Sequence, residues 1–197
     1  MRKSELKIQK RNQIIMAVIL VSIMVLSMFG IMLNQGNETI KYNGIKFEVD
    51  TENQGYLAHL EQGKIFFSAL PESLENVEFS SNICNSLKNS NTITILFDPT
   101  SENLNFIDFI RLNIQKAIKD QISFAITETS DVYPLYPVGN CSMATPENPI
   151  LFLNYNKNNT IVSFKEQSAN CFVASAKDNS FIILRDRLLY CYYGVME

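Results

Sequence analysis

The feature that most constrains this chain is an uncharged apolar run of 20 residues, Ile14–Leu33. As an α-helix with a rise of about 1.5 Å per residue, the run would be roughly 30 Å long, the thickness of the hydrocarbon core of a bilayer. The run therefore predicts one transmembrane helix.

The residues before this run carry five basic side chains and one acidic side chain, Glu5. Because an excess of Lys and Arg keeps a flanking segment in the cytoplasm, residues 1–13 are predicted to form a cytoplasmic tail. Residues 34–38 are then a stalk, and residues 39–197 form the extracytoplasmic domain of a single-pass cell-membrane protein.

Three other leader types begin in a similar way. A cleaved signal peptide usually has an apolar stretch of about 7–15 residues and an A-x-A-like exit, and the end of this run, Met28–Leu33, has no such exit. A lipoprotein would place a cysteine after the run, and a pilin-like leader would place a processing site before it. An uncleaved signal anchor is therefore the favoured interpretation.

Composition limits what the rest of the chain binds. The whole chain has a net charge of −3, and the tail contributes +4, so the remainder carries about −7. An acidic domain of this kind is poorly suited to nucleic acid or to anionic lipid headgroups. The remaining length suffices for one domain with its own core.

Local patterns predict an α/β domain, with α+β as an alternative, built as one mixed-sheet, three-layer domain with β-hairpins at its start. The turns Asn43-Gly44 and Gln62-Gly63 lie between alternating runs and mark the two hairpins. The expected strands and helices that follow are strand 76–80, helix 82–89, strand 92–98, helix 102–119 and strand 122–128. This order implies parallel strands joined by crossovers. Helix 102–119 has an apolar face and a polar stripe that includes Asp108 and Arg111.

A long loop and a second set of strands complete the predicted domain. Residues 129–149 contain four of the six prolines, and a loop of that length in a compact domain is either functional or an overlooked element. The elements expected after it are strands 150–155, 160–166 and 170–176 and a terminal helix over 181–196.

Four cysteines lie beyond the predicted anchor, which makes disulfides plausible with three possible connectivities. Cys141 and Cys171 both lie where a polar loop meets a strand, so they are the predicted pair. Cys84 and Cys191 lie in apolar patterns and are either buried free thiols or a second bridge. The absence of a CxxC spacing removes the usual redox and zinc-ribbon motifs.

No motif in the sequence identifies a reaction. The glycines match neither nucleotide-binding pattern, and G-x-S-x-G is absent. The single histidine, His59, has no partner that the sequence locates, so a structural role is favoured over catalysis. We therefore expect no cofactor and no metal site, and a protein that is more a binder than an enzyme.

Two carboxylates lie where strands of the predicted parallel sheet end, Asp98 and Glu128. Open α/β sheets bind ligands at this edge, so the pair could hold a cation or act as acid and base. A turn at Asp98 and a solvated strand end at Glu128 are the favoured interpretation. The triplet 185–187, Arg-Asp-Arg, could likewise hold an anion or form an ion pair on a helix face.

The proline-rich loop is the best candidate for recognition of a partner. Its aromatic and polar side chains offer rigid contacts and hydrogen bonds: Tyr133, Tyr136, Asn140, Ser142 and Thr145. The favoured alternative is that the prolines and a disulfide merely fix a long connection. Three glycosylation sequons, at Asn37, Asn140 and Asn158, fit an outward-facing domain.

The C-terminal half contains Cys141-x-x-Ala-Thr-Pro-x-x-Pro-Ile, Asn170-Cys171, Asp186-Arg-Leu-Leu-Tyr190 and Gly194-Val-Met196. In these residues the chain resembles small membrane-anchored archaeal proteins of uncharacterised function. The resemblance implies an anchor, an external α/β domain and pairing of Cys141 with Cys171, and it implies no activity.

The sequence thus predicts a membrane-anchored protein whose extracytoplasmic domain binds a protein or a cell-surface partner. The first alternative is an extracytoplasmic ligand-binding or hydrolytic domain that uses Asp98, Glu128 and the 129–149 loop. A second alternative is thiol chemistry at Cys141 and Cys171.

Overall fold

The computed structural model describes residues 13, 15–28, 39–158 and 162–196, in two units, Met1–Glu38 and Thr39–Glu197. Residues 15–28 are helical. Within the described ranges, none of the helices combines the length and the hydropathy that a membrane crossing requires. The predicted stalk, most of the predicted tail and residues 14 and 29–33 of the predicted span lie outside the described residues.

The second unit is a mixed α/β domain with two separate sheets, which confirms the fold class in outline. The strands are β1 (Thr39–Tyr42), β2 (Ile45–Asp50), β3 (Gly55–Leu60), β4 (Gly63–Phe67), β5 (Ile93–Phe97), β6 (Ile122–Ile126), β7 (Ile150–Tyr155), β8 (Ser163–Ser168) and β9 (Cys171–Ala176). The helices are η1 (Pro71–Leu74), α2 (Ser81–Lys88), α3 (Leu104–Ile118), η2 (Lys119–Gln121), η3 (Cys141–Met143) and α4 (Ser180–Tyr192).

The first sheet is an antiparallel meander in the order β1-β2-β3-β4. Asn43 and Gly44 both have positive φ, 47° and 80°, as a type I′ turn requires, so the first predicted hairpin is confirmed. The second hairpin turns one residue earlier than predicted. Gly63 pairs with Leu60, so the two-residue loop is Glu61-Gln62.

The second sheet has the order β6-β5-β7-β9-β8, in which only β8 runs antiparallel to its neighbour. Every residue of β5, Ile-Thr-Ile-Leu-Phe, is buried, as expected of a strand covered on both faces. The strand predicted at 76–80 was wrong. Only Glu78 forms a bridge, to Ser163, because α2 begins at Ser81 and leaves too short a segment for a ladder.

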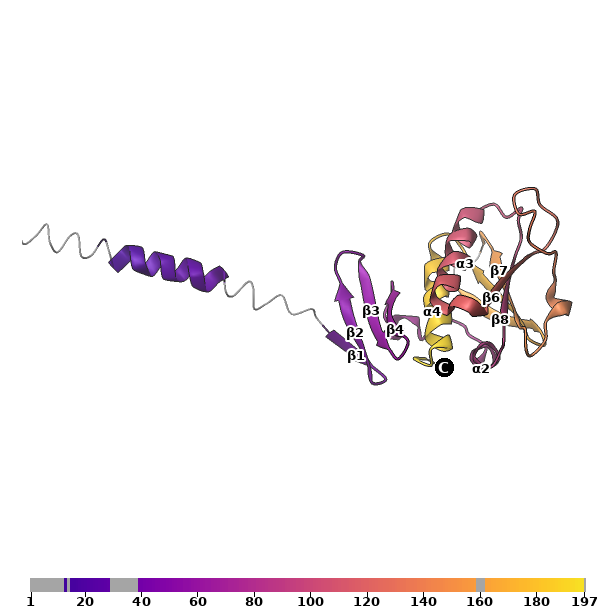
Figure 1. The fold of residues 1–197 in the computed structure, drawn as a ribbon, viewed down its shortest axis with the longest axis horizontal. Helices are drawn as coiled ribbons and strands as arrows, with labels where there is room; N and C mark the ends of the chain where they lie inside the picture. Colours follow the sequence, from indigo (N-terminus) through magenta and orange to yellow (C-terminus); the bar gives the residue numbers. More distant parts are fainter. Residues whose placement is uncertain (1–12, 14, 29–38, 159–161, 197) are drawn as a thin grey trace, which may run out of the picture. The chain divides into compact units, whose positions relative to one another are not determined.

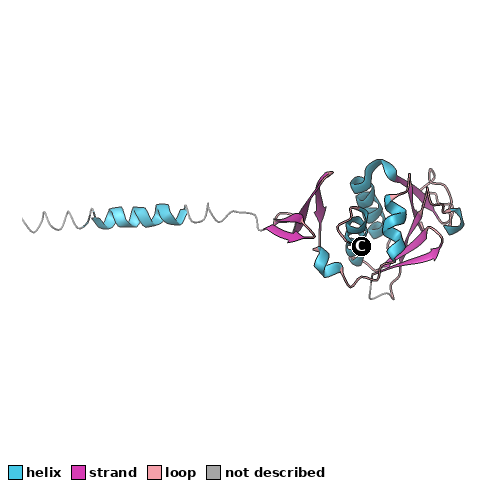
Figure 2. Ribbon diagram, turned by 90° about the horizontal axis from the view of Figure 1, so that it is seen from below, coloured by secondary structure: helices cyan, strands magenta, loops and turns pink. Residues whose placement is uncertain are grey.

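The three helices α2, α3 and α4 lie in one layer between the two sheets (Figure 1; Figure 2). Ile93, Ile95 and Phe97 of β5 alternate toward these helices and share a core with Phe47 and Phe67 of the first sheet. The opposite face of the second sheet carries a small separate cluster around Leu96, Ala125, Ile150 and Cys171, which the loop containing η3 covers. One mixed sheet was predicted, and the structure has two.

Helix α4 is central because both sheets contribute to the core in which it lies. The Tyr190 ring stacks on Phe67 with ring centroids 4.0 Å apart. The helix ends in a Schellman motif: Val195 N–H donates to Tyr190 O at 2.8 Å, Gly194 N–H donates to Cys191 O at 3.0 Å, and Gly194 has φ +74°. Glycine adopts this left-handed conformation without a Cβ clash, so the helix stops before the predicted residue 196.

Candidate functional site

The two predicted carboxylates follow neighbouring strands. Phe97 and Ile126 are register partners of β5 and β6, and Asp98 and Glu128 come directly or shortly after them. The backbone N–H and the hydroxyl of Thr100 both donate to Asp98 Oδ1, at 2.8 and 2.7 Å, which is a turn-forming arrangement. Glu128 is exposed. In the described residues, no group of three His, Cys, Asp or Glu side chains is placed to hold a metal ion.

The two predicted recognition tyrosines point into the domain. Tyr133 and Tyr136 stack on each other with ring centroids 5.6 Å apart, and both rings lie over the guanidinium of Arg111. Tyr133 Oη donates to Asp108 Oδ2 at 2.5 Å, while Arg111 donates to Tyr136 Oη at 3.0 Å. Burial, with a further contribution from Asp108, raises the pKa of Tyr133 to about 12.

Arg111 is only 5% exposed, so the sequence-based assignment of this residue to a polar stripe was wrong. The rings of Phe97 and Phe124 complete an aromatic enclosure around it. Burial alone would lower the pKa of Arg111, but hydrogen bonds to Asp108, at 2.7 Å, and to Tyr136 raise it. This cluster attaches the proline-rich loop to α3.

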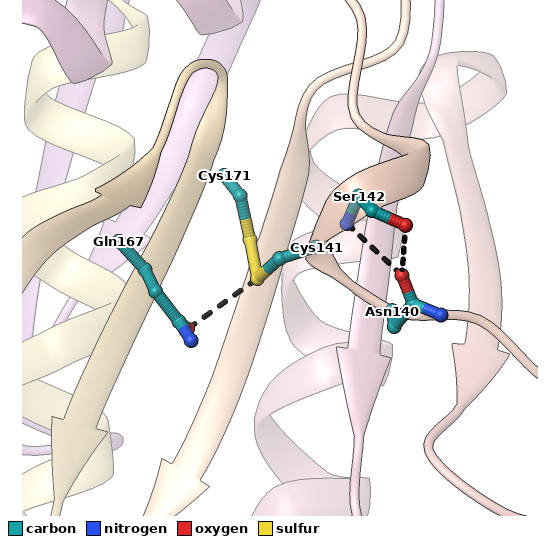
Figure 3. Close-up of a disulfide and its surroundings, with 5 residues drawn as sticks. All are labelled: Asn140, Cys141, Ser142, Gln167 and Cys171. Atoms are coloured by element: carbon teal, nitrogen blue, oxygen red, sulfur yellow. Dashed lines mark hydrogen bonds between the residues drawn. A yellow bond between two sulfur atoms is a disulfide. The ribbon is translucent and has the colours of Figure 1, made fainter.

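The remaining polar residues of the loop make local hydrogen bonds. Asn140 Oδ1 accepts from the backbone N–H of Ser142 at 3.0 Å and from its hydroxyl at 2.6 Å (Figure 3). Thr145 Oγ1 accepts from the N–H of Asn148 at 3.1 Å. These contacts fit the structural interpretation of the loop, and its role in binding stays a prediction.

Two disulfides are present, one of which joins the predicted pair. The bond between Cys141 and Cys171 links the loop to β9, with Gln167 beside it (Figure 3). The bond between Cys84 and Cys191 links α2 to α4 inside the main core. The sequence left open whether these two cysteines are free thiols or a second bridge, and the structure has the second bridge.

A cleft that the sequence does not predict lies beside the first sheet. The cleft has a volume of about 890 Å³ and is lined by residues of β3, β4, α3 and α4 and by the loop after β2. This volume is typical of ligand sites, which range from roughly 300 to 1,000 Å³. The β3–β4 hairpin, α3 and α4 are far apart from one another in the sequence, so no local pattern indicates the cleft.

Three exposed lysines line the cleft, Lys64, Lys116 and Lys119, together with one acidic residue, Asp50. The lysines outnumber the carboxylate, so the lining is positively charged in an acidic domain. Lys64 Nζ lies 2.8 Å from Glu48 Oε2, and the hydrogen bond from Lys64, with a further one from His59, lowers the pKa of Glu48 to about 2. Among the described side chains, no carboxylate forms an ion pair with Lys116 or Lys119.

Two tyrosines at the end of α4 provide the aromatic part of the lining. The rings of Tyr192 and Tyr193 meet edge to face, with centroids 5.2 Å apart. Their hydroxyls donate to Gln121 Oε1 and, at 2.7 Å, to the carbonyl of Ala117. Burial raises the pKa of both phenols above an ordinary value that already lies well above 7, so both are neutral near pH 7. The Schellman motif holds these residues in place.

The lining of the cleft has groups that suit the binding of an anion. Ammonium groups attract anions, and neutral phenols with neighbouring aromatic rings offer apolar contact area and hydrogen-bond acceptors. Of the described residues that line the cleft, none is a histidine, cysteine, serine or threonine, while Asp50 is its one carboxylate.

Arg185, buried at the edge of the cleft, is held by other groups. It forms an ion pair with Asp186, which also accepts from the backbone N–H groups of Ser68 and Ala69, at 2.7 and 3.0 Å. Burial raises the pKa of Asp186, while Arg185 and the two amides act in the opposite direction. Of the triplet 185–187, Arg185 and Asp186 thus form the predicted ion pair on α4, and this pair is buried within the core. Arg187 is buried as well, over the ring of Phe79.

Comparison of the chain with family models, with curated proteins and with solved structures gives no match.

Proposed function

We propose that this chain is a single-pass membrane protein whose extracytoplasmic α/β domain binds a ligand in the cleft between the first sheet and helices α3 and α4. The observation that carries the binding function is the lysine- and tyrosine-lined cleft in an otherwise acidic domain. The lysine ammonium groups of the cleft would attract an anionic ligand, whereas the net negative charge of the rest of the domain repels such a ligand.

Two further observations support the outward location. The basic tail followed by the apolar run Ile14–Leu33 is the pattern of a signal anchor with its N-terminus in the cytoplasm. The four cysteines of the domain form two disulfides, which persist in oxidising compartments and are rare in the cytosol. Hydrolysis by Asp98 and Glu128 has no such support, since the Asp98 carboxylate serves a turn.

Site-specific photocrosslinking tests the binding function on intact cells. A photoreactive benzoyl-phenylalanine replaces Gln62, an exposed residue that lines the cleft, and in a matched control it replaces Lys177, an exposed residue that does not. We expect a discrete adduct at position 62 and none at position 177. Equal labelling of both positions, or no adduct at position 62, contradicts a ligand site in this cleft.

A further inference from the structure

Strand β4 is an edge strand, and it borders the cleft. It is the last strand in the order β1-β2-β3-β4, so one of its two sides has no neighbouring strand among the described residues. Four consecutive residues of β4, from Gly63 to Phe66, line the cleft together with residues of α3 and α4. In Figure 1, β4 is the strand of this sheet drawn next to α4.

The register of the β3–β4 hairpin shows which backbone groups face the cleft. Leu60 and Gly63 close a two-residue loop, so they form a hydrogen-bonded pair, and the pairs along an antiparallel ladder alternate in type. Ile65 therefore bonds to β3, while the N–H and C=O groups of Lys64 and Phe66 point away from it. In the described part of the chain, neither residue has a backbone hydrogen bond outside its ladder.

Exposed strand edges are usually blocked by charge, by a bulge or by a covering segment. β4 carries a single lysine and no proline, and its register with β3 is continuous. An extended peptide that pairs with such an edge satisfies the open backbone groups of both partners.

The chemistry of the two faces specifies the side chains of this peptide. The inner face of the first sheet, which carries Phe47 and Phe67, faces the helices, where Lys116 and Lys119 belong to the lining. The outer face carries Leu57 and Phe66, which are register partners and also line the cleft. The side chains of a strand alternate between its two faces. A bound peptide with acidic side chains on one face and apolar side chains on the other would therefore suit the lysines on the inner side and the apolar residues on the outer side.

We propose that β4 accepts an extended peptide as a fifth strand of the first sheet, with acidic residues directed at Lys116 and Lys119 and apolar residues at Leu57 and Phe66. This inference rests on the proposed function, since it names the occupant of the same cleft. The peptide covers about five residues, the length of β4.

The test uses the full-length protein in nanodiscs and a fluorescent octapeptide in which Glu and Val alternate. Two N-methylated versions of this peptide, one with every Glu amide and one with every Val amide blocked, probe the backbone directly on the wild-type protein. Only one set of amides points at β4, so one version should lose at least about tenfold in affinity while the other stays within threefold. Equal behaviour of the two versions overturns strand addition.

Protein variants test the charge and the edge. Lys116→Glu and Lys119→Glu should each weaken binding about fivefold or more, whereas Lys177→Glu should change it less than twofold. Lys64→Ala and Lys64→Pro lose the same charge, but only the proline removes an N–H from the open edge, so only the proline should weaken binding further. Identical affinities of these two variants contradict the proposal.

The results separate this inference from the proposed function. A photoadduct at position 62 with a ligand that is not a peptide, together with no binding of the Glu-Val octapeptide, rejects strand addition and leaves the cleft as the ligand site. An absence of any adduct at position 62 rejects the proposed function itself.

Discussion

The two disulfides should stabilise the domain to different extents, because they close loops of different length. Cys84 and Cys191 are separated by 107 residues, and Cys141 and Cys171 by 30. The shorter loop lies inside the longer one, so with the inner bond in place the outer bond closes a path of about 77 residues. In the chain-entropy relation, these loops correspond to about 4.5 kcal/mol for the outer bond and about 3.6 kcal/mol for the inner bond.

Burial widens this difference. Cys84 and Cys191 are both within the main core, at 5% and 0% exposure, whereas in the inner pair only Cys171 is buried and Cys141 is half-buried. Replacing the outer pair by alanine therefore also leaves a small cavity in the core. The double variant Cys84→Ala/Cys191→Ala should lose about 5 kcal/mol of the free energy of unfolding, and Cys141→Ala/Cys171→Ala should lose about 3.5 kcal/mol.

The assay is urea unfolding of the full chain in detergent, followed by near-ultraviolet circular dichroism of the tyrosines. A thermal scan should show a lower Tm by roughly 10–20 °C for the outer pair. As a control, dithiothreitol should lower the stability of the wild type nearly to that of the variant without any cysteine, the remaining difference being the cavity that alanine leaves, and should not change the variant. A loss below about 2 kcal/mol for the outer pair, or a larger loss for the inner pair, refutes the reasoning.

Three further predictions concern single side chains. Glu48→Gln should destabilise the domain at pH 7, because the contact with Lys64 lowers the pKa of Glu48 in the folded state. The difference in stability from the wild type should shrink as the pH falls from 4.5 to about 2, and urea unfolding at several pH values measures this difference. Tyr133→Phe should remove one phenol, with a pKa of about 12, from the alkaline absorbance titration of the folded protein. The hydrogen bond from Tyr133 to Asp108 should stabilise the wild type below pH 10, and this stabilisation should be lost as the pH rises to about 12. Asp186→Asn should cost about 3–5 kcal/mol in thermal or urea unfolding, because it leaves a buried guanidinium without its counter-charge, and a cost below about 1 kcal/mol contradicts this.

Local signals predicted much of the fold. The Asn43-Gly44 turn, the all-apolar strand β5 and the amphipathic helix α3 were each predictable from neighbouring residues, because turn chemistry and periodicity act over a few positions. The number of sheets was not predictable in this way. Whether the hairpin strands join the central sheet or form their own depends on contacts such as Phe67 with Tyr190, which lie more than a hundred residues apart in the sequence.

The candidate site was less predictable than the fold. The tyrosines of the 129–149 loop were candidates for recognition, although a structural role of the loop was favoured. Tyr133 and Tyr136 enclose Arg111, which local periodicity assigned to the solvent. The cleft is assembled from β4, α3 and the end of α4, whose side chains meet only in the folded domain. The lysines and paired tyrosines of these elements were visible in the sequence, but their convergence was not.

The central claim is that the domain lies outside the cell, and cysteine labelling tests it most directly. Leu135, which is 91% exposed, is replaced by cysteine in one variant, and Lys3 of the basic tail in another. With a membrane-impermeant maleimide, position 135 should react in intact cells, and position 3 only after permeabilisation. Labelling of position 3 in intact cells, with position 135 protected until permeabilisation, would contradict the account.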